Sequence, residues 1–344
     1  MKKLELDITF TRDYFTKYFG IIFKDDYFYD VKYRVEMDQN IKTLLFKKWG
    51  NYGLGEENPD PIYQIGFDDT LNIILNFGGE VIIREGISWV RPGFLAKPEN
   101  IKKLEVPNIP YNYPNTFFLE KYDEAVSLYG KDSIKPPTPH GILECAIEMC
   151  GTAFFECLLL YPSEAEYLLD ILMETIIKMK EYWDKKCYGE VRPGIALGSC
   201  STTVLSPIQV SRFLVPRYIK IASKFGNGFL CSCGVSTHNL ENFAAISEAY
   251  YVRLGWGTDI VKAAALLKDR HLKPSLDVGR AVGLSVDEFE KDIISVLNSI
   301  KELENASILL IHASADAPDA NIKCLVETVR NWTNEHKVSL IQHY

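Results

Sequence analysis

The chain has 344 residues, of which 47% are apolar and 24% are charged, as in an ordinary globular protein. These proportions exclude disordered and fibrous classes. The 38 basic residues against 46 acidic ones give a net charge of −8, so the chain lacks the basic footprint of a nucleic-acid-binding protein. The length suits a single large α/β barrel.

No segment of the sequence predicts membrane insertion or export. The longest apolar run, residues 153–161, contains Glu156 and is too short to cross a bilayer. The first ten residues, MKKLELDITF, place charged residues among the apolar ones and lack the unbroken apolar core of a signal peptide. We therefore expect a cytoplasmic protein whose eight cysteines are reduced thiols rather than disulfides.

Residues 1–130 differ in composition from the rest of the chain, with many Tyr, Asn, Asp and Pro residues. This part is predicted to be an N-terminal extension of helices that contributes to a barrel and its rim. Within it, residues 79–84 and 87–91 predict a β-hairpin that turns at Glu85-Gly86.

Residues 131–344 alternate short apolar runs with helical patterns and form the main part of the predicted barrel. Strands are expected at 133–141, 194–198, 228–233, 249–254, 272–278 and 307–311. Helices are expected between and after them, among them 206–226, 259–268, 285–303 and 318–332.

Local signals mark where several of these helices begin or break. Ser163-x-x-Glu and Ser285-x-x-Glu each predict a capping box at a helix start. Ser206 followed by Pro predicts a third start, with a cap residue and a proline at the first helical position. Pro216 lies inside that third helix and predicts a kink or a break.

Strictly alternating helices and apolar strands predict parallel strands that are covered by helices. Six such units follow residue 130, and strands from the earlier part would complete a (β/α)8 barrel, the TIM-barrel fold. An open doubly wound sheet is the alternative. It is disfavoured because no Gly-x-Gly-x-x-Gly follows an early strand.

In such a barrel the functional residues follow the carboxyl ends of the strands. Cys231-Ser-Cys233 is the sharpest candidate, because two thiols at period two face the same way and suit Zn²⁺. His312 ends another strand and is the predicted third ligand, which leaves an open coordination position. The structural alternative is that both cysteines are small buried hydrophobes and that His312 is only hydrogen-bonded. Other polar or thiol side chains at strand ends are Ser199, Cys200 and Asp316.

Three further residues at strand ends or helix starts are candidates for catalysis, each with a structural alternative. Glu144 is a candidate general acid, or a carboxylate that favours a helix N-terminus. Asp277 would orient a substrate, or cap the turn after its strand. His140 would act in the site, or simply pack beside the prolines that precede it.

Four segments resemble the uroporphyrinogen decarboxylase superfamily, in its order, over residues 130–332. Residues 205–221, LSPIQVSRFLVPRYIKI, resemble its Ser-Pro helix. Residues 230–234, LCSCG, fall where its corrinoid-dependent methyltransferases carry His-x-Cys-Gly. Residues 276–278, LDV, resemble the end of one of its strands. Residues 308–324 resemble its closing loop and helix.

The resemblance implies a (β/α)8 barrel and, in its methyltransferase branch, zinc held by His, Cys and Cys. That branch exchanges a methyl group between a small molecule (a thiol, folate, amine or aryl methyl ether) and the cobalt of a corrinoid on a partner protein. The barrel rim would then admit the corrinoid, and Trp256 and Tyr250 are candidates to contact it. The set Cys231, Cys233 and His312 would be a permuted version of the family's ligands.

Two other functions remain open. The sequence lacks the Arg-Gln-Ala-Gly-Arg segment with which true decarboxylases of the superfamily hold their substrate, but a cofactor-independent decarboxylase of another acid is an alternative. A non-catalytic barrel that binds a corrinoid or another ligand is a second alternative.

Overall fold

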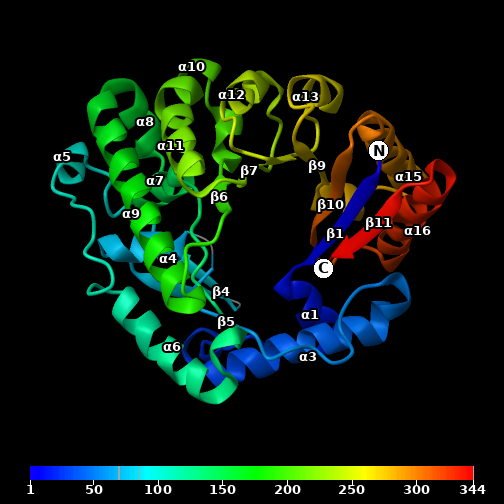
Figure 1. The fold of residues 1–344 in the computed structure, drawn as a ribbon, viewed down its shortest axis with the longest axis horizontal. Coiled ribbons are helices and arrows are strands. Elements are labelled where there is room, and N and C mark those ends of the chain that lie inside the picture. The colour runs from blue at the N-terminus through cyan, green and yellow to red at the C-terminus, as the bar shows by residue number, and fades with distance from the viewer. Residues whose placement is uncertain (69, 85, 344) are drawn as a thin grey trace.

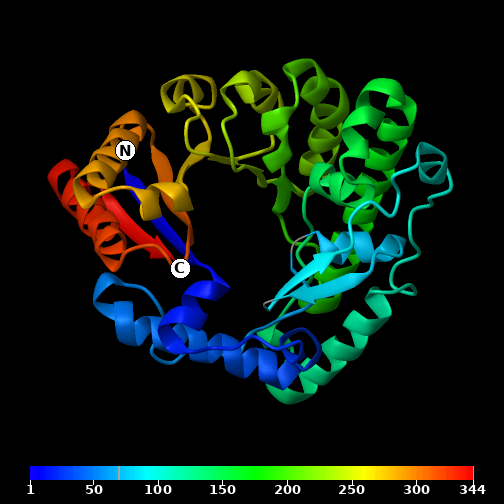
Figure 2. The same ribbon diagram turned by 180° about the vertical axis from the view of Figure 1, so that it is seen from behind.

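The computed structural model describes residues 1–68, 70–84 and 86–343. Its strands lie on the inner side of a ring and its helices lie on the outer side, as Figures 1 and 2 show from opposite directions. The first and last strands of the chain are neighbours, so that both termini lie on the same arc of the ring. No helix among the described residues has the length and apolar character needed to cross a membrane.

Seven parallel strands form the main sheet, in the order β11-β1-β10-β9-β8-β7-β6. Their bounds are β1 Lys3–Phe10, β6 Ile195–Gly198, β7 Gly228–Ser232, β8 Tyr251–Leu254, β9 His271–Leu276, β10 Asn305–Ala313 and β11 Ser339–His343. The sequence predicted five of these strands, from β6 to β10, within a few residues. It predicted neither the bounds of β1 nor the existence of β11, which pairs with the outer edge of β1.

A second parallel sheet pairs β2 (Tyr63–Gln64) with β5 (Ile134–Lys135). In the described part of the chain, no ladder joins β5 to β6 or β2 to β11, so the hydrogen-bonded ring is not closed. The predicted parallel strands are therefore confirmed, whereas the strand predicted at 133–141 has only two residues. Pro136, Pro137 and Pro139 follow it and lack the N–H groups that a ladder to β6 needs.

The helices that cover the outer side of the ring alternate with these strands (Figure 1). The longer ones are α1 Arg12–Phe19, α3 Val31–Trp49, α6 Asn115–Tyr129, α7 Ile142–Cys150, α8 Ala153–Leu160, α9 Pro162–Tyr188, α11 Val215–Phe225, α13 Ile260–Leu266, α15 Val286–Ile300 and α16 Asp319–His336. Short ones are α2 Asp26–Tyr29, α4 Leu71–Ile74, α5 Pro98–Ile101, α10 Pro207–Gln209, α12 Leu240–Ala245 and α14 Val278–Gly283.

Two of the three predicted helix starts have the expected caps. The Ser206 and Ser285 side chains each form a capping box, with Gln209 and Glu288 respectively. The prediction for Ser163 was wrong, because α9 begins one residue earlier, at Pro162, and Ser163 lies inside its first turn. The break predicted at Pro216 is confirmed, since a π-helical turn, Val210–Leu214, separates α10 from α11.

The predicted hairpin is present as β3 (Val81–Arg84) and β4 (Ile87–Val90), which pair in antiparallel fashion. Of its two turn residues, Gly86 has a φ of +74° and Glu85 lies outside the described residues. The Arg12 guanidinium binds both carboxylate oxygens of Asp68 and also donates to the Gly86 carbonyl. These contacts attach the hairpin to the start of α1.

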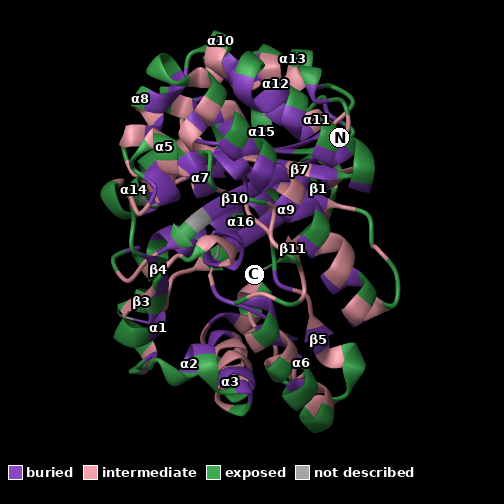
Figure 3. Ribbon diagram, turned by 90° about the vertical axis from the view of Figure 1, so that its left-hand side faces the viewer, coloured by how far each residue is buried: buried purple, intermediate pink, exposed green. Residues whose placement is uncertain are grey.

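The two faces of the main sheet differ in polarity, although the sequence predicted strands that are apolar throughout. On β1, Leu4, Leu6 and Ile8 are fully buried on the face that the helices cover. Glu5 and Asp7 alternate with them and therefore face the inside of the ring. Figure 3 shows the buried residues concentrated on the strands and on the helix faces beside them. The apolar core thus lies between strands and helices, and the inner face carries charges.

Candidate functional site

Three cysteine side chains meet at the carboxyl ends of β6 and β7. Cys231 lies in β7 and Cys233 directly follows that strand, two residues further on, and their sulfur atoms face the same side. Cys200 follows the neighbouring strand, whose last residue, Gly198, is in register with Cys231. The Sγ–Sγ distances are 2.6 Å for Cys200–Cys233, 3.8 Å for Cys231–Cys233 and 4.0 Å for Cys200–Cys231. Among the described residues these three form the group suited to a metal ion.

The contacts among the three thiols shift their pKa values in different directions. Hydrogen bonds from the Cys200 and Cys231 thiols lower the pKa of Cys233 to about 3. The same contacts, together with burial, raise the pKa of Cys231. Cys233 is exposed and the other two are half-buried, so the thiol with the lowered pKa is the one that solvent and small molecules can reach.

Glu144, on the first turn of α7, lies beside this cluster. Its Oε1 accepts a hydrogen bond of 2.9 Å from the Ser201 backbone N–H, directly after Cys200. Its Oε2 is buried and has no hydrogen-bond partner within the part of the chain that the structure describes. Burial raises the pKa of Glu144 against the lowering effects of Ser201 and His140. The sequence therefore singled out a carboxyl group that does lie at the cysteines.

His140 lies at the same strand end, against Gly198. A Cβ at Gly198 would come within 2.6 Å of the His140 ring, so only glycine allows this approach. The His140 Nδ1 is buried, and no described group forms a hydrogen bond with it. Two of the three predicted catalytic residues, His140 and Glu144, thus lie around the cysteines.

A close backbone contact holds α7 against the end of β6. A Cβ at Gly141 would lie 1.8 Å from the Gly198 carbonyl oxygen, closer than any atoms can pack. The buried Tyr218 hydroxyl donates a 2.6 Å hydrogen bond to the same oxygen. The short helix that starts at Cys200 is anchored by Asn239, whose amide donates to the Thr202 and Leu205 carbonyls.

Arg253, on β8, is the cationic residue of the site. It is in register with Cys231 on the adjacent strand, and its charge lowers the pKa of both Cys231 and Cys233. Its Nε is buried and has no hydrogen-bond partner among the described residues. Arg253 was not among the predicted site residues, although an arginine between Val252 and Leu254 in an apolar strand is itself a signal.

The prediction of His312 as the third member of the cysteine cluster was wrong in its geometry, because Cys200 takes that place. His312 lies near the end of β10, which is three strands away from β7 in the sheet, roughly 14 Å along it at ordinary strand spacing. Its φ is +59°, and its backbone N–H donates to the Thr9 hydroxyl. Cys200 had a usable signal, since it lies two residues after the end of a buried strand.

Asp277 lies at the end of β9 and has the capping role that was the alternative to a catalytic one. Its side chain accepts a 2.9 Å hydrogen bond from the Arg280 backbone N–H at the start of α14. β9 is two strands away from β7, so this carboxylate is not part of the cysteine group.

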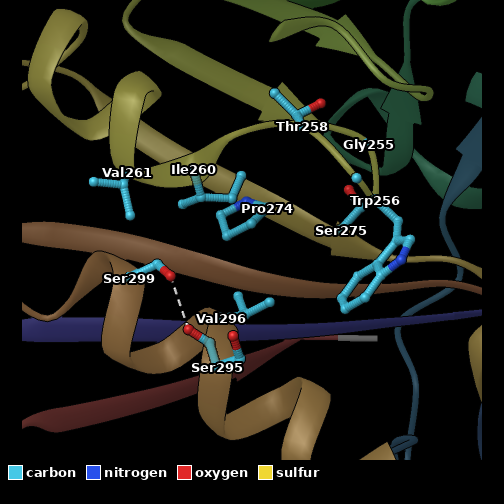
Figure 4. A pocket seen from close by; sticks show the side chains of 11 residues that line it. Gly255, Trp256, Thr258, Ile260, Val261, Pro274, Ser275, Ser295, Val296 and Ser299 are labelled. Atoms are coloured by element: carbon cyan, nitrogen blue, oxygen red, sulfur yellow. Dashed lines mark hydrogen bonds between the residues drawn. The ribbon is translucent and has the colours of Figure 1, made fainter.

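The two aromatic residues proposed for the rim lie at opposite ends of β8. Tyr250 precedes the strand, at the amino edge of the sheet, and its ring packs edge-on against Tyr251. It therefore lies at the edge opposite to the cysteines, which corrects its placement on the rim. Trp256 follows the strand and lines a cavity of about 220 Å³ between α13, β9 and α15 (Figure 4). The Arg280 guanidinium lies 4.7 Å from its ring centre.

The fold is similar to that of a methyltransferase from Methanosarcina mazei, with a TM-score of 0.65 and 15% identity over 96% of this chain and 94% of that chain. The two chains share a fold. A B12-independent methionine synthase from Shewanella sp. W3-18-1 in complex with selenomethionine has a TM-score of 0.44 and 10% identity, over 88% and 91% of the two chains. The sequence matches no protein-family model and no curated protein.

Proposed function

We propose that the protein is a zinc-dependent methyltransferase with a barrel of the uroporphyrinogen decarboxylase type, in which Cys200, Cys231 and Cys233 hold the metal. The convergence of three sulfur atoms at two adjacent strand ends is the observation that carries this proposal. The fold shared with the methyltransferase from Methanosarcina mazei supports it.

The distances and the chemistry of the donor set fit zinc. Two thiolates on a tetrahedral zinc lie about 3.8 Å apart, because each zinc–sulfur bond is about 2.3 Å long. The pairs Cys231–Cys233 and Cys200–Cys231, at 3.8 and 4.0 Å, already have this spacing. Cys200 and Cys233, at 2.6 Å, would need to separate by about 1 Å. The exposed position of Cys233 makes that movement inexpensive.

Three protein ligands leave a fourth position for a substrate atom, as in catalytic rather than structural zinc sites. A metal in this position acts as a Lewis acid, which lowers the pKa of a bound thiol or polarises a methylated heteroatom. The partner would be a protein-bound corrinoid. In transfer to a thiol substrate, the corrinoid would supply the methyl group. The metal held by Cys200, Cys231 and Cys233 would bind the substrate's sulfur as a thiolate and position it for the transfer.

The surrounding residues would position the ligands rather than react. Glu144 fixes the backbone at Ser201 and so orients Cys200, while Tyr218 and Gly141 fix the end of β6 through the Gly198 carbonyl. His140 presents a ring nitrogen to the same region. Its role would be to hold or move a proton of the substrate.

Metal analysis of freshly purified protein tests the proposal. We expect one zinc per chain, lost when Cys200, Cys231 or Cys233 is replaced by serine. Cys187→Ser and Cys324→Ser are matched controls, because both thiols are buried away from the cluster and should leave the zinc content unchanged. Folded wild-type protein that takes up no zinc when zinc is added would overturn the proposal.

Arg253 is the one observation that favours the alternative, a cofactor-independent decarboxylase. An arginine on the inner face beside the partly exposed Lys273 is suited to a carboxylate substrate. Release of CO2 by protein freed of metal would support that reading, and methyl transfer that needs zinc would exclude it.

A further inference from the structure

We propose that Arg253 binds an acid group of the small-molecule substrate, a carboxylate, sulfonate or phosphate, on the inner face of the sheet beside the cysteine cluster. This inference rests on the proposed function in one respect, that a substrate atom binds at the three sulfurs. It narrows the substrate class to small molecules with a negative charge close to the methyl-accepting or methyl-donating atom.

Arg253 has no carboxylate partner among the residues that the structure describes. Its neighbour on β9, Lys273, does have such a partner, because it forms an ion pair with Asp7 from β1. The Arg253 Nε is also buried without an acceptor. Arg253 as a whole is half-buried, so the cost falls on this one donor, which is unfavourable unless another group accepts from it.

The position of Arg253 suits a ligand that spans the cation and the sulfurs. It is directly across from Cys231 on the next strand, at the ordinary strand spacing of about 4.8 Å. Cys233 lies just beyond the end of the same strand, two residues after Cys231, and its sulfur is 3.8 Å from that of Cys231. An acid held at Arg253 therefore places an atom a short spacer away within reach of the metal ligands.

The inner face beside Arg253 is accessible to solvent. The inward-facing side chains of β7 and β8, Phe229, Cys231, Tyr251 and Arg253, all keep part of their surface accessible. The outward-facing Leu230, Val252 and Leu254 of the same strands are fully buried. The inner face is therefore open to solvent, with aromatic walls below a cationic centre.

Two other buried polar atoms near the same strand ends lack hydrogen-bond partners within the described residues, the Glu144 Oε2 and the His140 Nδ1. They lie on the opposite side of the cysteines from Arg253, at the start of α7. Buried polar groups are rarely left unpaired unless a ligand or water completes them. Together with the Arg253 Nε, unpaired buried polar atoms therefore flank the cluster on both sides, as expected for a polar ligand that lies across it.

Charge balance is the competing explanation for Arg253. Three thiolates and a divalent cation together carry one net negative charge, and a nearby guanidinium would offset it. If that were its whole role, Arg253 would affect the metal and not discriminate between charged and neutral ligands. The two explanations therefore differ in a measurable selectivity.

The experiment measures binding of mercaptopropanoate, mercaptopropanesulfonate, mercaptopropylphosphonate and neutral mercaptopropanol to the zinc-loaded full chain by calorimetry. We expect at least one acid to bind about tenfold or more tightly than the alcohol, as for a hydrogen bond to a charged group. Arg253→Gln should lower the affinity for that acid to the affinity for the alcohol, and should leave the affinity for the alcohol unchanged. Arg253→Lys should keep part of the preference for the acid, because lysine keeps the positive charge but lacks the paired N–H donors with which a guanidinium binds an acid group.

The ranking of the three acids identifies the acid group. Arg212→Gln is the matched control, since that arginine is exposed and pairs with Glu166 on the outer side. The inference would be overturned if the wild-type protein bound the acids and the alcohol with equal affinity. It would also be overturned if Arg253→Gln or Arg253→Lys reduced the affinity for the acids and the affinity for the alcohol by the same factor. Zinc content is measured in each variant. If no zinc binds, the proposed function fails. The role of Arg253 is then still tested in the metal-free chain, by comparing the binding of propanesulfonate with that of propanol in NMR titrations.

Discussion

The close approach of Gly141 to Gly198 makes Gly141→Ala a sensitive test of how the site is assembled. The new Cβ would lie 1.8 Å from the Gly198 carbonyl oxygen, 2.5 Å from its carbon and 2.7 Å from its Cα. All three are backbone atoms, so no change of side-chain rotamer can relieve the overlap. The end of β6 or the start of α7 must move by more than about 1 Å to restore ordinary contact.

The expected cost follows from two opposing terms. Overpacking of this kind destabilises a protein by about 1–3 kcal/mol, and a backbone overlap belongs at the upper end. Gly141 has φ −72° and ψ 148°, which alanine adopts freely, so the loss of unfolded-state entropy favours alanine by about 0.4–1 kcal/mol. We therefore expect a net destabilisation of about 2 kcal/mol.

Urea denaturation followed by circular dichroism measures this change. Gly283→Ala, at the end of α14, is the matched control, because a Cβ there meets no atom within 4 Å and the expected effect is neutral or slightly stabilising. We also expect Gly141→Ala to weaken zinc binding, measured by competition with a chromophoric chelator, since Glu144 would lose its position at Ser201. A Gly141→Ala protein as stable as the Gly283→Ala protein would refute the reasoning.

Two other substitutions test contacts around the site. Tyr218→Phe removes the hydrogen bond to the Gly198 carbonyl and should destabilise the protein by about 1–2 kcal/mol in the same urea assay. Asp68→Asn removes the negative charge that faces Arg12 and should cost about 2 kcal/mol at neutral pH. Burial raises the pKa of Asp68, but the bonds and charge of Arg12 outweigh it and lower that pKa below its usual range. The contribution of Asp68 is therefore complete above the unfolded-state pKa of about 3.9 and is lost as the pH falls through the lower, folded-state pKa.

Each of these two predictions has a clear contrary result. A Tyr218→Phe protein with unchanged stability would show that the Gly198 carbonyl finds another donor. For Asp68→Asn, the difference from the wild type should shrink only below about pH 4, so a difference that shrinks between pH 8 and pH 5 would contradict the assigned pKa direction.

The sequence by itself determined the features that depend on neighbouring residues. The capping boxes at Ser206 and Ser285 and the break before Pro216 follow from backbone groups within a few positions. The common direction of Cys231 and Cys233 follows from the period of two in a strand. The alternation of strands and helices, and hence a parallel sheet, has the same local origin. Ser163 shows the limit of such signals, because Pro162 offers a competing helix start one residue earlier.

Tertiary structure alone decided which strand ends meet. Cys200 joins Cys231 because β6 pairs with β7, whereas His312 ends a strand three positions away. Spacing along the chain carries no information about that order, so a histidine and a cysteine at strand ends were equally plausible partners. The polar inner face and the position of Arg253 on it could not be predicted either, because a strand pattern shows two faces without saying which one the helices cover. Distances across a sheet depend on strand order, and only the folded chain fixes that order.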